Sequence, residues 1–90
     1  MPRQPKKKSD LLEIPGIGQT FVTDFARIGV KSQTDLVDAD PDELFLRLKT
    51  ENNSLGHATS KNYLYVLRMA IYYASGGRDY GKLKWHVWKD

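Results

Sequence analysis

The sequence contains no cysteine and only two histidines among its 90 residues. The absence of cysteine excludes disulfides, thiolate metal sites and a cysteine nucleophile. His57 and His86 alone are too few ligands for a zinc site, and no serine pattern accompanies them as a nucleophile. The glycine-rich stretch at residues 16–18 is too short for a nucleotide-binding loop and lacks its Gly-Lys-Ser/Thr ending. The sequence therefore predicts a protein that is not an enzyme and has no cofactor and no metal.

Long hydrophobic runs are also missing. The longest apolar-rich stretch, residues 63–74, is interrupted by Arg68 and is too short to cross a bilayer. The basic residues near the N-terminus are followed by no apolar stretch of signal-peptide length. We therefore expect a cytoplasmic protein that has no membrane partner. With 90 residues, of which 40% are hydrophobic, the chain is expected to form one small domain that buries nearly all its large apolar side chains.

Charge is unevenly distributed along the chain, although the net charge is only +3. Residues 1–31 carry a net charge of +3, residues 32–56 carry −4, and residues 57–90 carry +4. A polyanion is therefore expected to be attracted to the two ends of the sequence and repelled by its middle. Charge alone is equally compatible with ordinary solvated faces. The acidic residues of the middle segment are expected to favour a helix start rather than to bind a metal.

Residues 1–8 contain two prolines and four basic residues. We interpret them as a disordered basic arm, and residues 9–90 as the folded domain. Such an arm can wrap a phosphate backbone, but many small proteins carry one for solubility alone.

The most distinctive stretch is residues 11–20, where a Pro-Gly-Ile-Gly turn joins an apolar segment to a helical pattern. Pro15 fixes the entry angle of the turn. Gly16 and Gly18 have no Cβ, so they allow positive φ angles and a close approach to another molecule. The two isoleucines of the stretch are too apolar for a solvent loop and are expected to anchor the turn on the core. Because a helix begins directly after the turn, its free amides form a potential anion site that the helix dipole strengthens.

Periodicity and capping residues predict five helices. They cover residues 9–13, 19–28, a short segment from residue 32, residues 41 to about 50, and residues 59–74. Gly29 is expected to end the second helix, and Asp40 to cap the fourth, which Pro41 begins. Ser32 and Asp35 resemble a capping box. The expected core residues of these helices are Phe21, Val22, Phe25, Ile28, Leu36, Val37, Leu44, Phe45, Leu48, Tyr63, Leu64, Val66, Leu67, Ala70, Ile71 and Ala74.

Two further segments leave alternatives open. The polar loop at residues 51–60 lies where a domain with two tandem hairpins would have its second hairpin. Its Leu55-Gly56-His57 lacks the Gly-x-Gly pattern, so a hairpin here would be degenerate at best. The C-terminal tail carries Trp85 and Trp88. We expect them to close the bottom of a small core, with stacking on bases or on a protein partner as the alternative.

Three parts of the sequence together resemble a helix-hairpin-helix motif. They are the stretch Leu12-x-x-Ile-Pro-Gly-Ile-Gly, the helix ending at residues 27–30, and Ser32-x-x-Asp35-Leu36. With residues 40–44, 65–70 and 83–90, nearly everything from Asp10 onward is similar to small bacterial proteins labelled pathogenicity-locus or mitomycin-resistance helix-hairpin-helix proteins. This resemblance implies an all-α, compact five-helix bundle, like sterile-alpha-motif (SAM) domains, with the tryptophan-containing tail packed on it. The mitomycin-resistance label points to a DNA-damage context.

The motif implies binding to the DNA sugar-phosphate backbone through hairpin amides, with little reading of base sequence. About two to four phosphates would be engaged, so binding is expected to be weak, salt-dependent and no tighter than about micromolar. This chain has Gln19 where the motif often has a basic residue. The candidate DNA-binding residues are Pro15, Gly16, Ile17, Gly18, Gln19, Thr20, Arg27 and Lys31.

A protein-interaction module is the alternative function. Helical bundles of this general shape, including SAM domains, also serve as oligomerisation or docking units. In that case the hairpin is a structural corner, and the acidic fourth helix or the two tryptophans form the contact surface.

Overall fold

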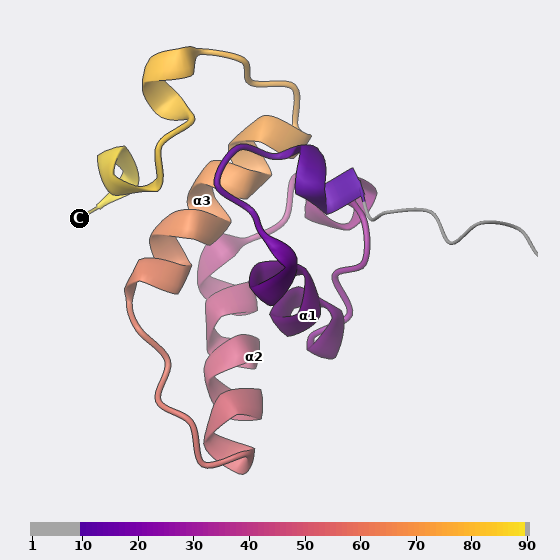
Figure 1. Ribbon diagram of the computed structural model, residues 1–90, viewed down its shortest axis with the longest axis vertical. Helices are drawn as coiled ribbons and strands as arrows, with labels where there is room; N and C mark the ends of the chain where they lie inside the picture. Colours follow the sequence, from indigo (N-terminus) through magenta and orange to yellow (C-terminus); the bar gives the residue numbers. More distant parts are fainter. Residues whose placement is uncertain (1–9, 90) are drawn as a thin grey trace, which may run out of the picture.

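Three α-helices form where the sequence combines helical periodicity with start and stop signals. The computed structural model describes residues 10–89, and in that range it contains helices and turns but no strand (Figure 1). The α-helices are α1 (Gln19–Arg27), α2 (Pro41–Ser54) and α3 (Asn62–Ala74). Four short 3₁₀ helices accompany them: η1 (Asp10–Glu13), η2 (Gln33–Leu36), η3 (Tyr80–Lys82) and η4 (Trp85–Trp88).

Capping chemistry explains where the α-helices begin and end. The Asp40 side chain accepts a hydrogen bond from the Asp42 amide at 3.0 Å, and Pro41 occupies the first helical position of α2. At the end of α1, Gly29 has a φ of +85°, and the Val30 N–H donates to the Phe25 carbonyl at 2.9 Å. This bond pairs a carbonyl that the helix leaves unsatisfied. The predicted cap at Asp40 and the predicted stop at Gly29 are both confirmed.

Two of the five predicted helices are single 3₁₀ turns. The segment predicted for residues 9–13 is η1, with Ser9 outside the described residues, and the segment predicted from residue 32 is η2. Each is only four residues long, which is too short for a ladder of i→i+4 bonds, so the tighter i→i+3 pattern forms instead. The Asp35 carboxylate still accepts the Ser32 amide at 3.2 Å, as the predicted capping box requires.

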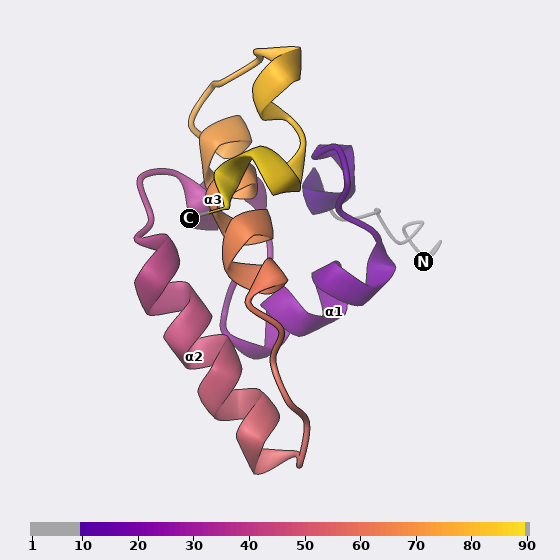
Figure 2. The same ribbon diagram turned by 90° about the vertical axis from the view of Figure 1, so that its left-hand side faces the viewer.

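The core lies where α1, α2 and α3 meet. α2 and α3 run side by side, α1 packs on α2, and the C-terminal turn η4 lies along α3 (Figures 1 and 2). Phe25, Leu36, Leu48 and Leu67 are fully buried, as predicted. Because η4 lies along α3, the predicted packing of the tryptophan-containing tail on the bundle is also confirmed.

Three predictions about this region are wrong. Val37 is 46% exposed, because η2 ends at Leu36 and the extended backbone at Val37 turns the chain outward. α2 continues to Ser54, beyond the predicted end near residue 50, because the Asn52 side chain is buried and hydrogen-bonded within the fold. The fifth predicted helix also starts later than expected, because α3 begins at Asn62 rather than at residue 59, so the loop before it covers residues 55–61.

Within residues 10–89, no helix is both long and apolar enough to cross a membrane. The predicted cytoplasmic location stays a prediction. The predicted basic arm, residues 1–8, lies outside the described residues.

Candidate nucleic-acid interface

The Pro-Gly-Ile-Gly stretch folds into a tight turn between η1 and α1. The Ile17 N–H donates to the Ile14 carbonyl at 3.1 Å, and Gly16 has a φ of +84°. Proline in the second position and a positive-φ glycine in the third are typical of a type II turn. The residue types of the stretch thus account for its backbone shape.

Both isoleucines of the turn point into the core. Ile14 is 1% exposed and Ile17 is 5% exposed, so the predicted anchoring is confirmed. The Cε of Met69 on α3 lies 3.7 Å from the position of a Cβ on Gly16. The turn is therefore held against α3, and its conformation does not depend on a bound partner.

The backbone amides that follow the turn are left without an acceptor among the described residues. Gly18, Gln19 and Thr20 are exposed, and their amides donate no hydrogen bond to residues 10–89. They belong to the first turn of α1, where N–H groups have no intrahelical acceptor and the helix dipole is positive. Nothing lies within 4 Å of a Cβ built on Gly18, so a side chain at this position would have open space.

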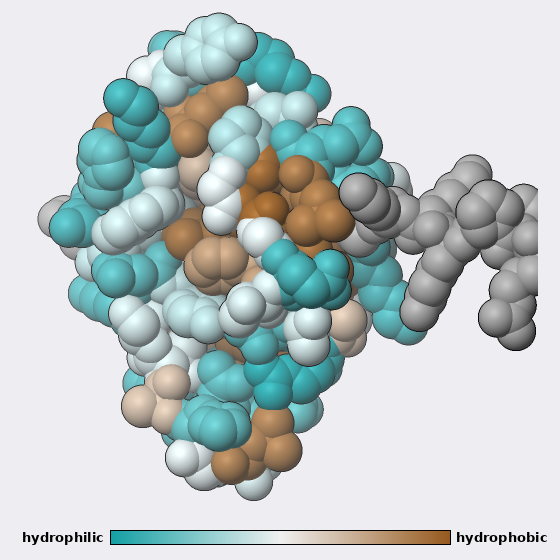
Figure 3. All heavy atoms as spheres, viewed as in Figure 1, coloured by the Kyte–Doolittle hydropathy of each residue, from teal (hydrophilic) through white to brown (hydrophobic). Residues whose placement is uncertain are grey.

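The hairpin and the acidic start of α2 lie on opposite sides of the molecule. Figure 2 shows the beginning of α1 at one edge of the molecule and the beginning of α2 at the other, with α3 between them. The acidic first turn of α2 therefore lies away from the hairpin. Figure 3 shows that the hairpin side carries a patch of apolar atoms at its centre, surrounded by hydrophilic side chains.

The two predicted basic contacts, Arg27 and Lys31, do not converge on the hairpin. Arg27 is at the far end of α1, about 13 Å along the axis from Gly18 at 1.5 Å per residue. Lys31 follows the turn after α1 and is exposed. Their participation in DNA binding stays a prediction, and it requires a phosphate other than the one at the hairpin amides.

Arg27 also takes part in an internal polar network that the sequence did not reveal. One of its terminal nitrogens forms an ion pair with Asp24 and donates to the Asn52 side-chain oxygen at 3.2 Å. The Asn52 amide nitrogen donates to the Thr59 hydroxyl at 2.8 Å, and the Tyr63 hydroxyl donates to Asp24 at 3.0 Å. This polar network joins α1, the end of α2, the following loop and α3.

The polar network alters the acidity of Tyr63. Burial raises the pKa of the Tyr63 hydroxyl above its usual value, and the hydrogen bond to the Asp24 carboxylate raises it further. The spacing of Asp24 and Arg27, three residues apart on one helix, is the one sequence signal for this network. The roles of Asn52 and Thr59 depend on tertiary contacts.

The segment predicted as a degenerate second hairpin is a helix C-cap. Gly56 has a φ of +78°, and the His57 N–H donates to the Asn52 carbonyl at 2.8 Å. The Gly56 N–H donates to the Asn53 carbonyl at 3.0 Å, which completes a Schellman motif at the end of α2. This turn faces a polar cleft of about 460 Å³, which Thr20 and Thr23 of α1 line from the other side.

Within residues 10–89, no three histidine or acidic side chains come together in a metal-binding geometry. His57 lies in the turn after α2, and the ring of His86 is 5.9 Å from that of Trp85.

Comparison with known proteins adds one finding to this geometry. A family model for Cdd1, described as a pathogenicity locus, matches residues 4–90. No curated protein and no solved structure gives a significant match. The matched range includes the turn, all three α-helices and the C-terminal turns. The chain therefore belongs to the Cdd1, or pathogenicity-locus, family.

Proposed function

We propose that this protein binds the phosphate backbone of DNA, without sequence specificity, through a helix-hairpin-helix unit made of η1, the Pro-Gly-Ile-Gly turn and α1. The single observation that carries the proposal is the set of exposed residues Gly18, Gln19 and Thr20, whose amides have no acceptor within residues 10–89 and follow a turn held by two buried isoleucines. Amides at a helix N-terminus bind phosphate oxygens through hydrogen bonds and the helix dipole. Such contacts position a protein on DNA but carry no sequence information.

The charges around the hairpin favour weak binding. Between residues 10 and 31 the sequence has two basic residues, Arg27 and Lys31, against three acidic ones. The affinity for DNA then depends on a few amide–phosphate hydrogen bonds and on phosphate contacts by the four basic residues within positions 3–8. With two to four phosphates engaged, the logarithm of the binding constant is expected to fall with a slope of about −2 to −4 against the logarithm of salt concentration.

Fluorescence anisotropy with a labelled generic duplex tests the proposal. At low salt we expect a Kd no tighter than about micromolar that weakens as salt is added. Gly18→Glu places a carboxylate beside the amides, at a position where a side chain has open space, and is expected to weaken binding at least about tenfold. Gly18→Ala is the matched control, because it adds a Cβ without a charge at a φ of −105°.

The two variants separate loss of contact from loss of fold. Circular dichroism melting of both should resemble that of the wild type within a few degrees. If folded Gly18→Glu binds the duplex as tightly as Gly18→Ala, the hairpin is not the contact and the proposal fails.

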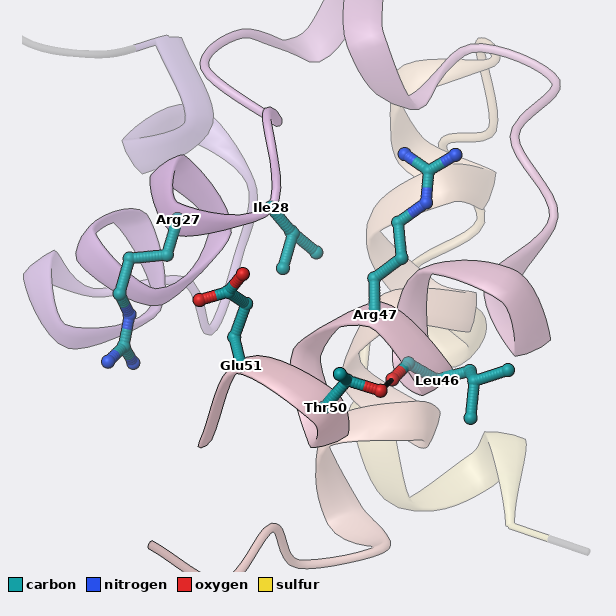
Figure 4. Close-up of a pocket in the computed structure, with 6 residues that line it drawn as sticks. All are labelled: Arg27, Ile28, Leu46, Arg47, Thr50 and Glu51. Carbon is teal, nitrogen blue, oxygen red and sulfur yellow. Dashed lines mark hydrogen bonds between the residues drawn. The ribbon is translucent and has the colours of Figure 1, made fainter. Parts of the chain in front are cut away.

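A second candidate, a SAM-like protein-interaction module, is supported by a cleft of about 410 Å³ between the end of α1 and the outer face of α2. Figure 4 shows Leu46 and Arg47 of α2 at this cleft, with Ile28, the residue that follows α1, on its other side. Leu46 is 63% exposed, so its side chain is available for contact with a partner at this cleft. The interaction-module candidate predicts self-association that Leu46→Asp abolishes, which light scattering after size exclusion measures. The DNA-binding proposal predicts that Leu46→Asp has no effect on duplex affinity.

A further inference from the structure

The last part of the chain mixes aromatic and basic side chains. We define the C-terminal segment as residues 78–89, which contain η3 and η4. Its basic residues are Arg78, Lys82, Lys84 and Lys89, its aromatic residues are Tyr80, Trp85 and Trp88, and its only acidic residue is Asp79. Aromatic rings interleaved with cations are typical of surfaces that bind single-stranded nucleic acids.

A cleft opens where this segment meets α3. It has a volume of about 560 Å³ and is lined by Pro41, Arg68, Ile71, Tyr72 and Trp88. Apart from Arg68, the lining is apolar or aromatic. The rings of Tyr72 and Trp88 have centroids 5.5 Å apart and are tilted by 47°. Trp88 also borders a second hollow of about 300 Å³, together with Gly81, Lys82 and Val87.

Hydrogen bonds hold Trp88 in this position. Its indole N–H donates to the Lys82 carbonyl at 2.8 Å, and Arg68 donates to the Trp88 carbonyl at 2.7 Å. The side chain is half-buried, so part of the indole stays accessible. A fixed, accessible ring offers a stacking surface with little conformational entropy to lose on binding.

Cations lie beside the aromatic rings. The Lys82 Nζ is 5.8 Å from the centre of the Tyr72 ring, and the Lys89 Nζ is 5.3 Å from the centre of the Trp85 ring. Tyr80 is 86% exposed, so its ring makes almost no contribution to the core. The segment thus places positive charge next to half-buried aromatic rings, with an exposed ring nearby in sequence, which suits a ligand that alternates phosphates with flat rings.

We propose that the C-terminal segment is a binding site for single-stranded nucleic acid. An unpaired base enters the cleft that Tyr72 and Trp88 line and stacks on the accessible part of the indole, a neighbouring base stacks on Tyr80, and the phosphates pair with the lysines of the segment. Asp40 and Asp42 flank Pro41, so the phosphates run along the opposite, lysine-bearing side. Only an unpaired strand exposes the faces of its bases, so a duplex cannot bind in this way. The site uses none of the hairpin residues.

Tryptophan fluorescence provides a direct test, because Trp85 and Trp88 are the only tryptophans in the sequence. Titration of the full chain with a short oligothymidylate is expected to quench this fluorescence in a saturable manner, and added salt should reverse the quenching. A duplex of the same length is expected to bind without comparable quenching, since the hairpin contains no tryptophan. Strand binding seen by anisotropy without quenching, or no strand binding at all, overturns the proposal.

Variants separate the two parts of the site. Tyr80→Ala removes an exposed ring, and the double variant Lys82→Glu/Lys84→Glu reverses two exposed charges. Each is expected to weaken oligothymidylate binding about tenfold, the loss of one stacked base or of two phosphate contacts. Lys49→Glu, an exposed charge reversal on α2, is the matched control and should change the affinity less than about threefold. An equal loss in Lys49→Glu means that net charge, not this segment, drives binding, and the proposal fails.

The hairpin variant makes the two proposals separately testable. Gly18→Glu is expected to lose duplex binding and to keep the oligothymidylate-induced quenching. Quenching that disappears in Gly18→Glu assigns strand binding to the hairpin and contradicts a separate site. If instead a peptide or protein, and no oligonucleotide, quenches Trp85 and Trp88, the segment is a protein-docking surface and the proposal is wrong.

Discussion

The turns at Gly16 and Gly56 have almost the same backbone angle and opposite roles. Their φ angles are +84° and +78°. Gly16 lies in a turn that leads into α1, whereas Gly56 ends α2 by a Schellman motif. A glycine with positive φ is therefore no sign of a binding hairpin by itself. The residues around it decide whether it begins or ends a helix.

Packing is the larger difference between the two turns. Ile14 and Ile17 on either side of Gly16 are buried, while Leu55 beside Gly56 is 53% exposed. The first turn is thus fixed against the core and presents its amides in one arrangement. The second turn is attached to the fold by polar side chains, through Asn52 and Thr59. The two turns therefore differ in what anchors them, apolar side chains in the core for the first and polar side chains for the second.

Removing the apolar anchors gives the largest expected effect. Ile14→Ala deletes a side chain that is 1% exposed and is expected to reduce the free energy of unfolding by about 3 kcal/mol. Leu55→Ala, the equivalent change at the second turn, is expected to cost less than about 1 kcal/mol, because Leu55 is already largely in solvent. Urea unfolding of both variants measures the difference, and equal losses would contradict the contrast between the turns.

Breaking the polar network comes next. Asp24→Asn removes the carboxylate that pairs with Arg27 and accepts the Tyr63 hydroxyl, and it is expected to cost about 2 kcal/mol. The partial exposure of Arg27 keeps the loss below that of a fully buried pair. Glu51→Gln removes an exposed acid of α2 and is the control. Its free energy of unfolding should stay within about 0.5 kcal/mol of that of the wild type.

The glycines themselves sharpen the comparison. Gly16→Ala and Gly56→Ala both force an L side chain into a positive φ, so each is expected to lower the free energy of unfolding by about 1–2 kcal/mol. Gly18→Ala, at a φ of −105°, should cost less than about 1 kcal/mol. If only Gly16→Ala weakens duplex binding, the first turn alone is the contact. Thermal melting and anisotropy on the same samples provide the measurement.

The smallest effect concerns Tyr63. Tyr63→Phe is expected to cost about 1 kcal/mol at neutral pH, because Asp24 loses a hydrogen-bond donor. The pKa of Tyr63 is raised in the fold, so the unfolded chain releases this proton first. The stability from the neutral hydroxyl is then complete below about pH 10 and is lost as pH rises above it. Urea unfolding from pH 8 to 11 should show a shallower alkaline decline for Tyr63→Phe, and identical slopes would rule out this linkage.

Much of the candidate hairpin was predictable from sequence because its signals are local. Pro15 and Gly16 specify the turn, the two isoleucines specify its anchoring, and the helix start at Gln19 follows directly. The length of α2 was underestimated, since its last turn is stabilised by Asn52 contacts with residues distant in sequence. The extended, exposed backbone at Val37 was also missed, because an apolar residue next to a buried leucine reads as core.

By itself the sequence determined the all-helical class, the helix cap at Asp40, the helix stop at Gly29 and the shape of the turn at Gly16. These depend on φ preferences, capping side chains and apolar spacing, all of which act within a few residues. Only the tertiary structure decided which side each surface faces. It placed the start of α1 away from the acidic start of α2. It also paired Arg27 with Asp24 and Asn52 and packed Trp88 against Tyr72. Those outcomes follow from the packing of the three helices on one core, which places residues far apart in sequence side by side.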